Sequence, residues 1–144
     1  DAIAMLHGEI GTDHEPWEAG GGNAGDGVAF TSDFDGDGLD DIGVGAPLIS
    51  TAYVASGTAR GQIELETDSV FRLYDVTLPN LGEHVASLGD TNGDGVKELL
   101  VGIGANGGGP LVARYTQNYQ RIDQFFAFGP ANGAASFNGG VFPG

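Results

Sequence analysis

The chain of 144 residues contains no cysteine and few basic residues. Without cysteine there is no disulfide and no thiol chemistry, and cysteine usage does not indicate the redox compartment. Five Lys and Arg residues stand against 20 Asp and Glu residues, which gives a net charge of −15. This balance argues against nucleic acid and anionic membrane surfaces as partners, because both are bound through Lys and Arg. No apolar run is long enough to span a bilayer, so no membrane insertion is predicted.

Helical periodicity is also missing, since no segment sustains a period of 3.6 residues, and we expect very little helix. Glycine, in contrast, accounts for 27 residues without a collagen period, as is typical of many short strands joined by tight turns. The length fits one domain, and the predicted fold class is all-β. Neither a G-x-S-x-G elbow nor a P-loop is present, and we predict that the chain is not an enzyme.

The densest feature of the sequence is T-S-D-F-D-G-D-G-L-D-D-I-G-V-G-A-P, at residues 31–47. Carboxylates at alternate positions converge only if the backbone curls around a centre, and their mutual repulsion then calls for a cation. Ca²⁺ takes about six to eight oxygen ligands with flexible geometry, whereas Mg²⁺ keeps most of its waters. Gly38 would supply the positive φ of the curl. The expected ligands are the side chains of Asp33, Asp35, Asp37 and Asp41 and the carbonyl oxygen of Leu39.

The same pattern recurs 57 residues later as D-T-N-G-D-G-V-K-E, at residues 90–98. Its expected ligands are Asp90, Asn92, Asp94, the carbonyl oxygen of Val96, and Glu98. The match extends upstream, where N-A-G-D-G-V-A aligns with N-L-G-E-H-V-A, and downstream, where D-I-G-V-G aligns with E-L-L-V-G. Internal repetition on this scale indicates a repeat architecture. The sequence therefore predicts two calcium sites in two related units.

Two other interpretations of these loops are weaker. Asp and Gly are common in ordinary turns, but two acidic loops in register between apolar segments are not expected by chance. An EF-hand or dockerin loop needs a bidentate acid at its twelfth position. Val44 and Val101 occupy that position here, and no helical pattern follows either loop.

Each unit is expected to contain about four strands, with the acidic loop between the first and the second. Strands are predicted at residues 1–10, 28–30, 42–46, 62–66, 70–76, 84–88, 99–103, 111–116 and 121–128, and none at residues 47–58. The predicted divisions are 1–22 (N-terminal strand and loop), 23–79 (first unit), 80–136 (second unit) and 137–144 (the lead-in strand of an incomplete third unit).

The N-x-G-[DE]-x-V-A segment, the D-x-[DN]-G-D-G-x-x-[DE] loop and V-G-A-P at residues 44–47 resemble the FG-GAP repeat, over roughly residues 23–142. This repeat is the calcium-binding blade of integrin-α-like β-propellers and of bacterial secreted proteins. The resemblance implies two four-stranded blades of an incomplete propeller and the same calcium ligands. The chain departs from the family in three ways. Ala24-Gly25 and Leu81-Gly82 replace Phe-Gly, Glu98 replaces the usual final Asp, and two units fall short of the about four to eight blades that close a propeller.

Open blades expose strand edges and end faces that can pair with another chain. The predicted function is a calcium-binding structural or adhesion module that assembles with copies of itself, or with adjacent blades, into a ring or filament. We expect it to be extracellular or on the cell surface, because weak extracellular modules are tuned to the millimolar calcium found there. The alternatives are a calcium-dependent carbohydrate-binding module, in which calcium or Trp17 meets the sugar, and a non-catalytic propeller fragment of a secreted hydrolase. Besides other copies or adjacent blades, the expected partners are a glycan or a cell-surface protein.

Overall fold

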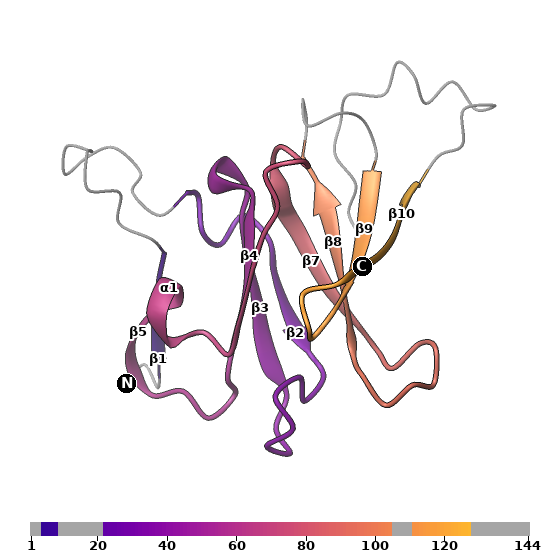
Figure 1. The fold of residues 1–144 in the computed structure, drawn as a ribbon. Coiled ribbons are helices and arrows are strands. Elements are labelled where there is room, and N and C mark those ends of the chain that lie inside the picture. The colour runs from indigo at the N-terminus through magenta and orange to yellow at the C-terminus, as the bar shows by residue number, and fades with distance from the viewer. Residues whose placement is uncertain (1–3, 9–21, 105–110, 128–144) are drawn as a thin grey trace.

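A computed structural model describes residues 4–8, 22–104 and 111–127, and this part of the chain is built mainly of strands (Figure 1). The strands are β1 (Ala4–His7), β2 (Val28–Thr31), β3 (Asp41–Ala46), β4 (Thr51–Ala55), β5 (Gly61–Glu64), β6 (Phe71–Tyr74), β7 (Leu81–Gly89), β8 (Glu98–Ile103), β9 (Leu111–Thr116) and β10 (Arg121–Phe126). The 3-10 helix η1 (Pro47–Ile49) and the α-helix α1 (Leu65–Asp68) are short. For the described residues, the prediction of an all-β fold with little helix is confirmed, and no helix there is long and apolar enough to cross a membrane.

Each half of the chain forms a four-stranded antiparallel sheet. The first sheet has the order β2-β3-β4-β6, and the second has the order β10-β9-β8-β7. Neighbouring strands are antiparallel in both sheets. The chain therefore meanders from each strand to its neighbour, and the internal repeat of the sequence corresponds to a repeat of the fold (Figure 1).

The first sheet differs from the prediction at its third strand. This strand is β4, in a segment where the sequence predicted none, and all five of its residues are buried. A strand buried on both faces lacks the polar–apolar alternation that marks a half-buried strand.

The strand predicted at residues 62–66 is wrong in its last two residues. β5 ends at Glu64, and residues 65 and 66 belong to α1. The Asp68 carboxylate accepts a hydrogen bond from the Glu64 backbone N–H at 2.9 Å, and such a local bond competes with a strand ladder. The remaining predicted strands are present with bounds shifted by a few residues, and the lead-in strand predicted at residues 137–144 lies outside the described residues.

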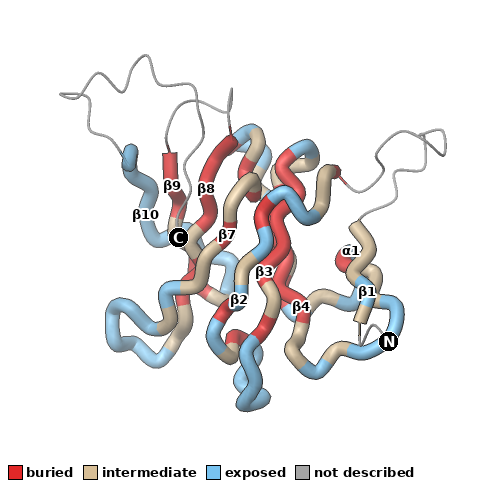
Figure 2. Tube along the Cα trace, turned by 180° about the vertical axis from the view of Figure 1, so that it is seen from behind, coloured by how far each residue is buried: buried red, intermediate tan, exposed pale blue. Residues whose placement is uncertain are grey.

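A third, smaller layer covers the far side of the first sheet. β1 pairs in parallel with β5, and together with α1 it lies on the side of the first sheet that faces away from the second (Figures 1 and 2). A cluster of buried residues fills the space beneath this layer: Val44, Ala46, Tyr53, Ala55 and Leu65, with Leu6 packed against them. The N-terminal strand thus stabilises the first half of the chain.

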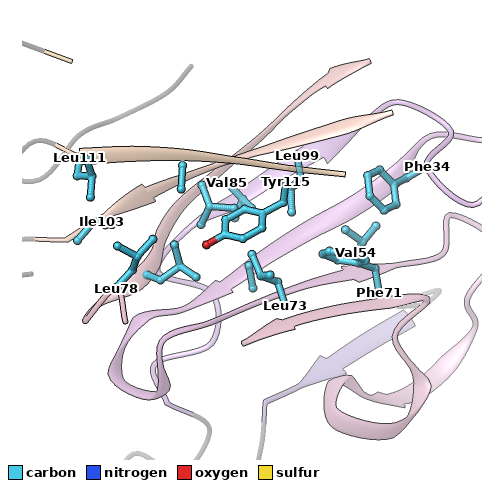
Figure 3. Close-up of a cluster of buried hydrophobic side chains, with 14 residues drawn as sticks. Phe34, Val54, Phe71, Leu73, Leu78, Val85, Leu99, Ile103, Leu111 and Tyr115 are labelled. Carbon is cyan, nitrogen blue, oxygen red and sulfur yellow. The ribbon is translucent and has the colours of Figure 1, made fainter. Parts of the chain in front are cut away.

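The two four-stranded sheets pack face to face through the larger apolar cluster (Figure 3). Leu99, Val101 and Ile103 occupy alternate positions of β8 and are fully buried. Val54 and Leu73 from the first sheet belong to the same cluster. Because burial of one large aliphatic side chain contributes about 1.5–3 kcal/mol, this interface is the main attraction between the two halves.

Glycine allows the two sheets to approach closely at one point. A Cβ atom on Gly45 of β3 would collide with the carbonyl oxygen of Gly82 in β7. Gly82 itself has φ of +99°, a conformation that L-residues with side chains rarely adopt. This close backbone approach brings the end of β3 against the start of β7.

Candidate metal centres

The two acidic loops connect the first and second strands of each sheet. The first joins β2 to β3 and the second joins β7 to β8, and both lie exposed at the same end of the molecule (Figures 1 and 2). Gly36 and Gly38 of the first loop have φ of +87° and +92°, and Gly93 and Gly95 of the second have +76° and +84°. The positive φ predicted at Gly38 is confirmed.

In the first loop, Asp33, Asp35 and Asp37 come together. One carboxylate oxygen of each lies within 4.8 Å of the others. The loop holds its own shape, because Asp35 Oδ1 accepts the N–H of Asp37 at 3.0 Å and Asp37 Oδ1 accepts the N–H of Leu39 at 2.8 Å. These bonds leave the three carboxylates on the inner side of one curl, where a cation would offset their repulsion.

Asp41 lies outside that group of three. It begins β3 and is fully buried. Its Oδ2 accepts the backbone N–H groups of Phe34 and Asp35, at 2.7 and 3.0 Å, and its Oδ1 accepts the N–H of Gly57 at 2.8 Å. Both oxygens are therefore bonded to the chain itself, and Asp41 fastens the loop to the segment after β4.

In the second loop, Asp90, Asp94 and Glu98 each place one carboxylate oxygen within 4.8 Å of the others. The Asp90 carboxylate accepts three backbone N–H groups, from Gly93, Asp94 and Gly95, at 2.7–3.1 Å. Asn92 also belongs to the hydrogen-bond network of this loop, because its amide donates to Asp94 Oδ2 at 3.0 Å. Leu39 and Val96 are placed on their loops by N–H bonds to Asp37 and Asp94, and their carbonyl ligation stays a prediction.

Glu98 is the counterpart of Asp41 but is bonded differently. It is 0% exposed. Its Oε2 accepts two bonds from Thr91, one from the backbone N–H at 2.7 Å and one from the hydroxyl. Its Oε1 is buried and has no hydrogen-bond partner among the described residues. A buried carboxylate oxygen without a partner is costly, and a cation beside Asp90 and Asp94 would provide the missing partner.

A lysine of the second loop reaches the first loop. Lys97 Nζ lies 3.6 Å from Asp33 Oδ2. Desolvation favours the neutral form of Asp33, but the N–H groups of Gly38 and Gly36 and the charge of Lys97 outweigh it, so the pKa of Asp33 lies below its usual value. The hydroxyls of Ser32 and Ser87 also meet, at 3.2 Å. The two loops are therefore in direct contact.

No protein-family model matches the chain.

Three residues outside the predicted ligand sets act in the loops. Thr91 holds Glu98, Lys97 pairs with Asp33, and Arg114 connects the second loop to β10. Arg114 donates to the Thr91 hydroxyl at 3.0 Å and binds Asp123 through two nitrogens, at 2.8 and 3.2 Å. Hydrogen bonding to Asp123 raises the pKa of Arg114 against desolvation, and the charges of Asp123 and Glu98 add to it. Thr91 aligns with Phe34 in the repeat, and the backbone bond to the acid seven residues later is the same in both loops.

Proposed function

We propose that the chain is a calcium-binding structural or adhesion module outside the cell, built from two FG-GAP-like blades, and that it is not an enzyme. The observation that carries the proposal is Glu98. Its carboxylate is fully buried, one of its oxygens has no partner among the described residues, and it lies with Asp90 and Asp94 in one group of oxygens. Such a group is unfavourable unless a cation shares it.

Calcium is the cation that these donors fit best. Both groups offer carboxylate oxygens, with no histidine or cysteine. Ca²⁺ binds such hard ligands in irregular loops more readily than Mg²⁺, which demands octahedral geometry, or Zn²⁺, which favours nitrogen and sulfur. When bound, Ca²⁺ supplies positive charge to a chain whose net charge is −15.

The role of the loop residues is architectural. In each sheet they set the turn between the first and second strands, and the contact between the loops ties one sheet to the other. Because the acids repel one another in the absence of a cation, metal binding adds to the free energy of folding. The chain's own contribution is the network of backbone N–H bonds that brings the carboxylates together.

Exposed apolar residues at the sheet edges support the proposal of self-assembly. Phe30 on β2 is 82% exposed, and Phe125 and Phe126 on β10 are 48% and 52% exposed. β2 and β10 are edge strands of the two sheets. Sheet edges with large exposed apolar side chains, without a further paired strand among the described residues, favour association, so we propose that further blades cover them, either from other copies of this chain or from a longer propeller.

Light scattering tests the assembly directly. With millimolar calcium, particles heavier than one chain are expected, and excess EDTA should dissociate them. A monomer in both solutions would exclude assembly and leave the longer propeller as the source of the missing blades. Neither outcome affects the calcium sites, which are tested by the melting experiments below.

A further inference from the structure

A cleft lies between the two halves of the molecule, and none of its lining residues belongs to the acidic loops. It has a volume of about 440 Å³, and it is lined by β6 and the residues after it on one side and by β9, β10 and their connecting turn on the other. This size falls within the range of about 300–1,000 Å³ that is usual for small-molecule sites. Figure 3 shows two of its lining residues, Tyr115 and Leu73, between the sheets.

The floor of the cleft is a hydrogen-bonded carboxylate. Asp75 Oδ1 accepts the N–H and the hydroxyl of Thr77, at 2.9 and 2.5 Å. Its Oδ2 accepts the Tyr115 hydroxyl at 2.8 Å and Arg121 Nη1 at 3.2 Å. Desolvation acts against the charge, but the bonds from Thr77 and Tyr115 and the charge of Arg121 outweigh it and lower the pKa of Asp75. Asp75 is therefore ionised at neutral pH, and it orients the arginine.

Several N–H donors of the Arg121 guanidinium have no acceptor among the described residues. Within the described residues its guanidinium bonds only through Nη1, to Asp75 and, at 3.4 Å, to Thr77. Nε and Nη2 donate to no group in that part of the chain, and the side chain is 38% exposed. A guanidinium presents its donors in a planar fork that matches the two oxygens of a carboxylate.

The charges of the cleft are balanced in pairs. Arg121 lies 3.2 Å from Asp75, and Arg72, which also lines the cleft, lies 3.8 Å from Glu66 and over the ring of Tyr53. The lining therefore lacks the excess of carboxylates found in the acidic loops, and an anionic group of a ligand is more favourable here than over those loops.

Two tyrosines supply aromatic surface beside the arginine. Tyr119 has φ of +64°, which is rare for a residue with a side chain, and its ring stacks on Phe71 with the ring centres 4.7 Å apart. Tyr119 and Tyr74 remain 58% and 60% exposed. An aromatic ring that is buried on one side and open on the other can pack against the apolar face of a sugar ring. The lining combines these aromatic faces with the polar groups of Arg121, Asp75 and Thr77, and a sugar presents both an apolar ring face and polar groups to such a surface.

We propose that this cleft binds an acidic sugar, with the sugar carboxylate on Arg121 and the sugar ring against Tyr119. The site does not involve the calcium loops and stands or falls independently of them. Asp75 and Tyr115 act as positioning residues, because they hold Arg121 in place.

Isothermal titration calorimetry with trigalacturonate tests the proposal, using calcium-loaded protein. Maltotriose, a neutral trisaccharide, is the matched ligand control. We expect trigalacturonate to bind and maltotriose to bind about tenfold more weakly or not at all, since a charge-assisted bond contributes about 1.5–3 kcal/mol. Arg121→Gln and Tyr119→Ala should each weaken trigalacturonate binding by about tenfold or more. Arg60→Gln is the matched protein control, because Arg60 bonds only its own turn.

The melting temperature of each variant shows whether it is folded. For a variant that does not fold, Arg121→Lys and Tyr119→Phe take its place. The lysine keeps the charge but loses the fork and should weaken binding, whereas the phenylalanine keeps the ring and should retain it. Equal binding of the two trisaccharides, unchanged binding by Arg121→Gln, or capture of an acidic peptide in place of the sugar would overturn the proposal. Binding that is abolished by EDTA and unaffected by Arg121→Gln would assign the sugar to the calcium loops and would also overturn it.

Discussion

The two acidic loops share one sequence pattern but differ in how the last acid is used. In the first loop, Asp41 gives both carboxylate oxygens to three backbone N–H groups. In the second loop, Glu98 has the longer side chain, bonds only Thr91, and leaves one buried oxygen without a partner among the described residues. The last acid of the first loop is therefore satisfied by the chain itself, whereas the last acid of the second loop keeps one oxygen available for a cation. In the first loop the buried oxygen without a partner among the described residues belongs instead to Asp33, through its Oδ1.

The loops also differ in the positively charged side chains that lie beside their carboxylates. Lys97 of the second loop lies against Asp33 of the first, so the first carboxylate group has a protein cation beside it before any metal binds. The second group has Arg114 near Glu98, but that guanidinium is bonded to Asp123 and Thr91. We therefore expect the stability of the second loop to depend more on calcium than the stability of the first.

Chelation should have the largest effect on stability, because it removes the cation from both loops at once. At each site, a ligand at 1,000 times its Kd stabilises the folded state by about 4 kcal/mol, which corresponds to a melting temperature about 14 °C higher per site for a chain of this size. Calorimetry with calcium and then with excess EDTA measures the difference. Asp35→Ala should reproduce part of it without EDTA. A melting temperature unchanged by EDTA would refute a structural role for calcium.

Asp41→Ala should be the most damaging single substitution in the loops, and its effect should not depend on calcium. It leaves three buried or half-buried N–H groups without their acceptor, at a cost of about 3 kcal/mol. Denaturant unfolding in calcium and in EDTA measures the loss in each condition. A loss seen only with calcium would show that Asp41 acts as a ligand instead of a loop fastener.

The effect of Glu98→Gln on the free energy of unfolding should have opposite signs without and with calcium. In EDTA the substitution removes a buried, incompletely bonded charge, so the variant should be about 1–2 kcal/mol more stable than the parent chain. In calcium the parent should be the more stable of the two, because the variant has lost a charged ligand. The same unfolding experiment in both conditions shows the reversal. If the variant were less stable in both, the account of Glu98 as a cation-dependent residue would fail.

Lys97→Met should have the smallest effect of these changes, and it tests whether the lysine accounts for the difference between the two loops. The substitution removes the Lys97 ammonium from beside Asp33, and with it a positive charge that competes with calcium at the first site. A partly exposed ion pair contributes up to about 1 kcal/mol. Calcium affinity of the first site should rise by about two- to fivefold, as measured by calorimetry in the Glu98→Gln background. Weaker binding would mean that Lys97 organises the loop for the metal and does not compete with it.

Local patterns made the loops predictable from the sequence. Alternating acids and glycines determine the curl over a few residues, and the 57-residue repeat placed the second loop by analogy with the first. The structure brings together Asp33, Asp35 and Asp37 in one group and Asp90, Asp94 and Glu98 in the other, as those patterns predicted.

Longer-range contacts were not predictable in the same way. Ligation by Asp41 stays a prediction, but its bond from the N–H of Gly57, in the segment after β4, was not predictable from the local pattern. Lys97 and Asp33 meet only because the sheets pack so that the loops are adjacent. β4 escaped prediction because burial on both faces removes the alternation that marks a strand. Each of these depends on tertiary packing, which no local pattern records.

Calcium titration of the EDTA-stripped protein tests the central claim most directly. Isothermal calorimetry should show two calcium ions bound per chain, and Glu98→Gln should weaken or remove one of them while the other is retained. Absence of calcium binding, or binding that Glu98→Gln leaves unchanged at both sites, would contradict the assignment of these loops as calcium centres.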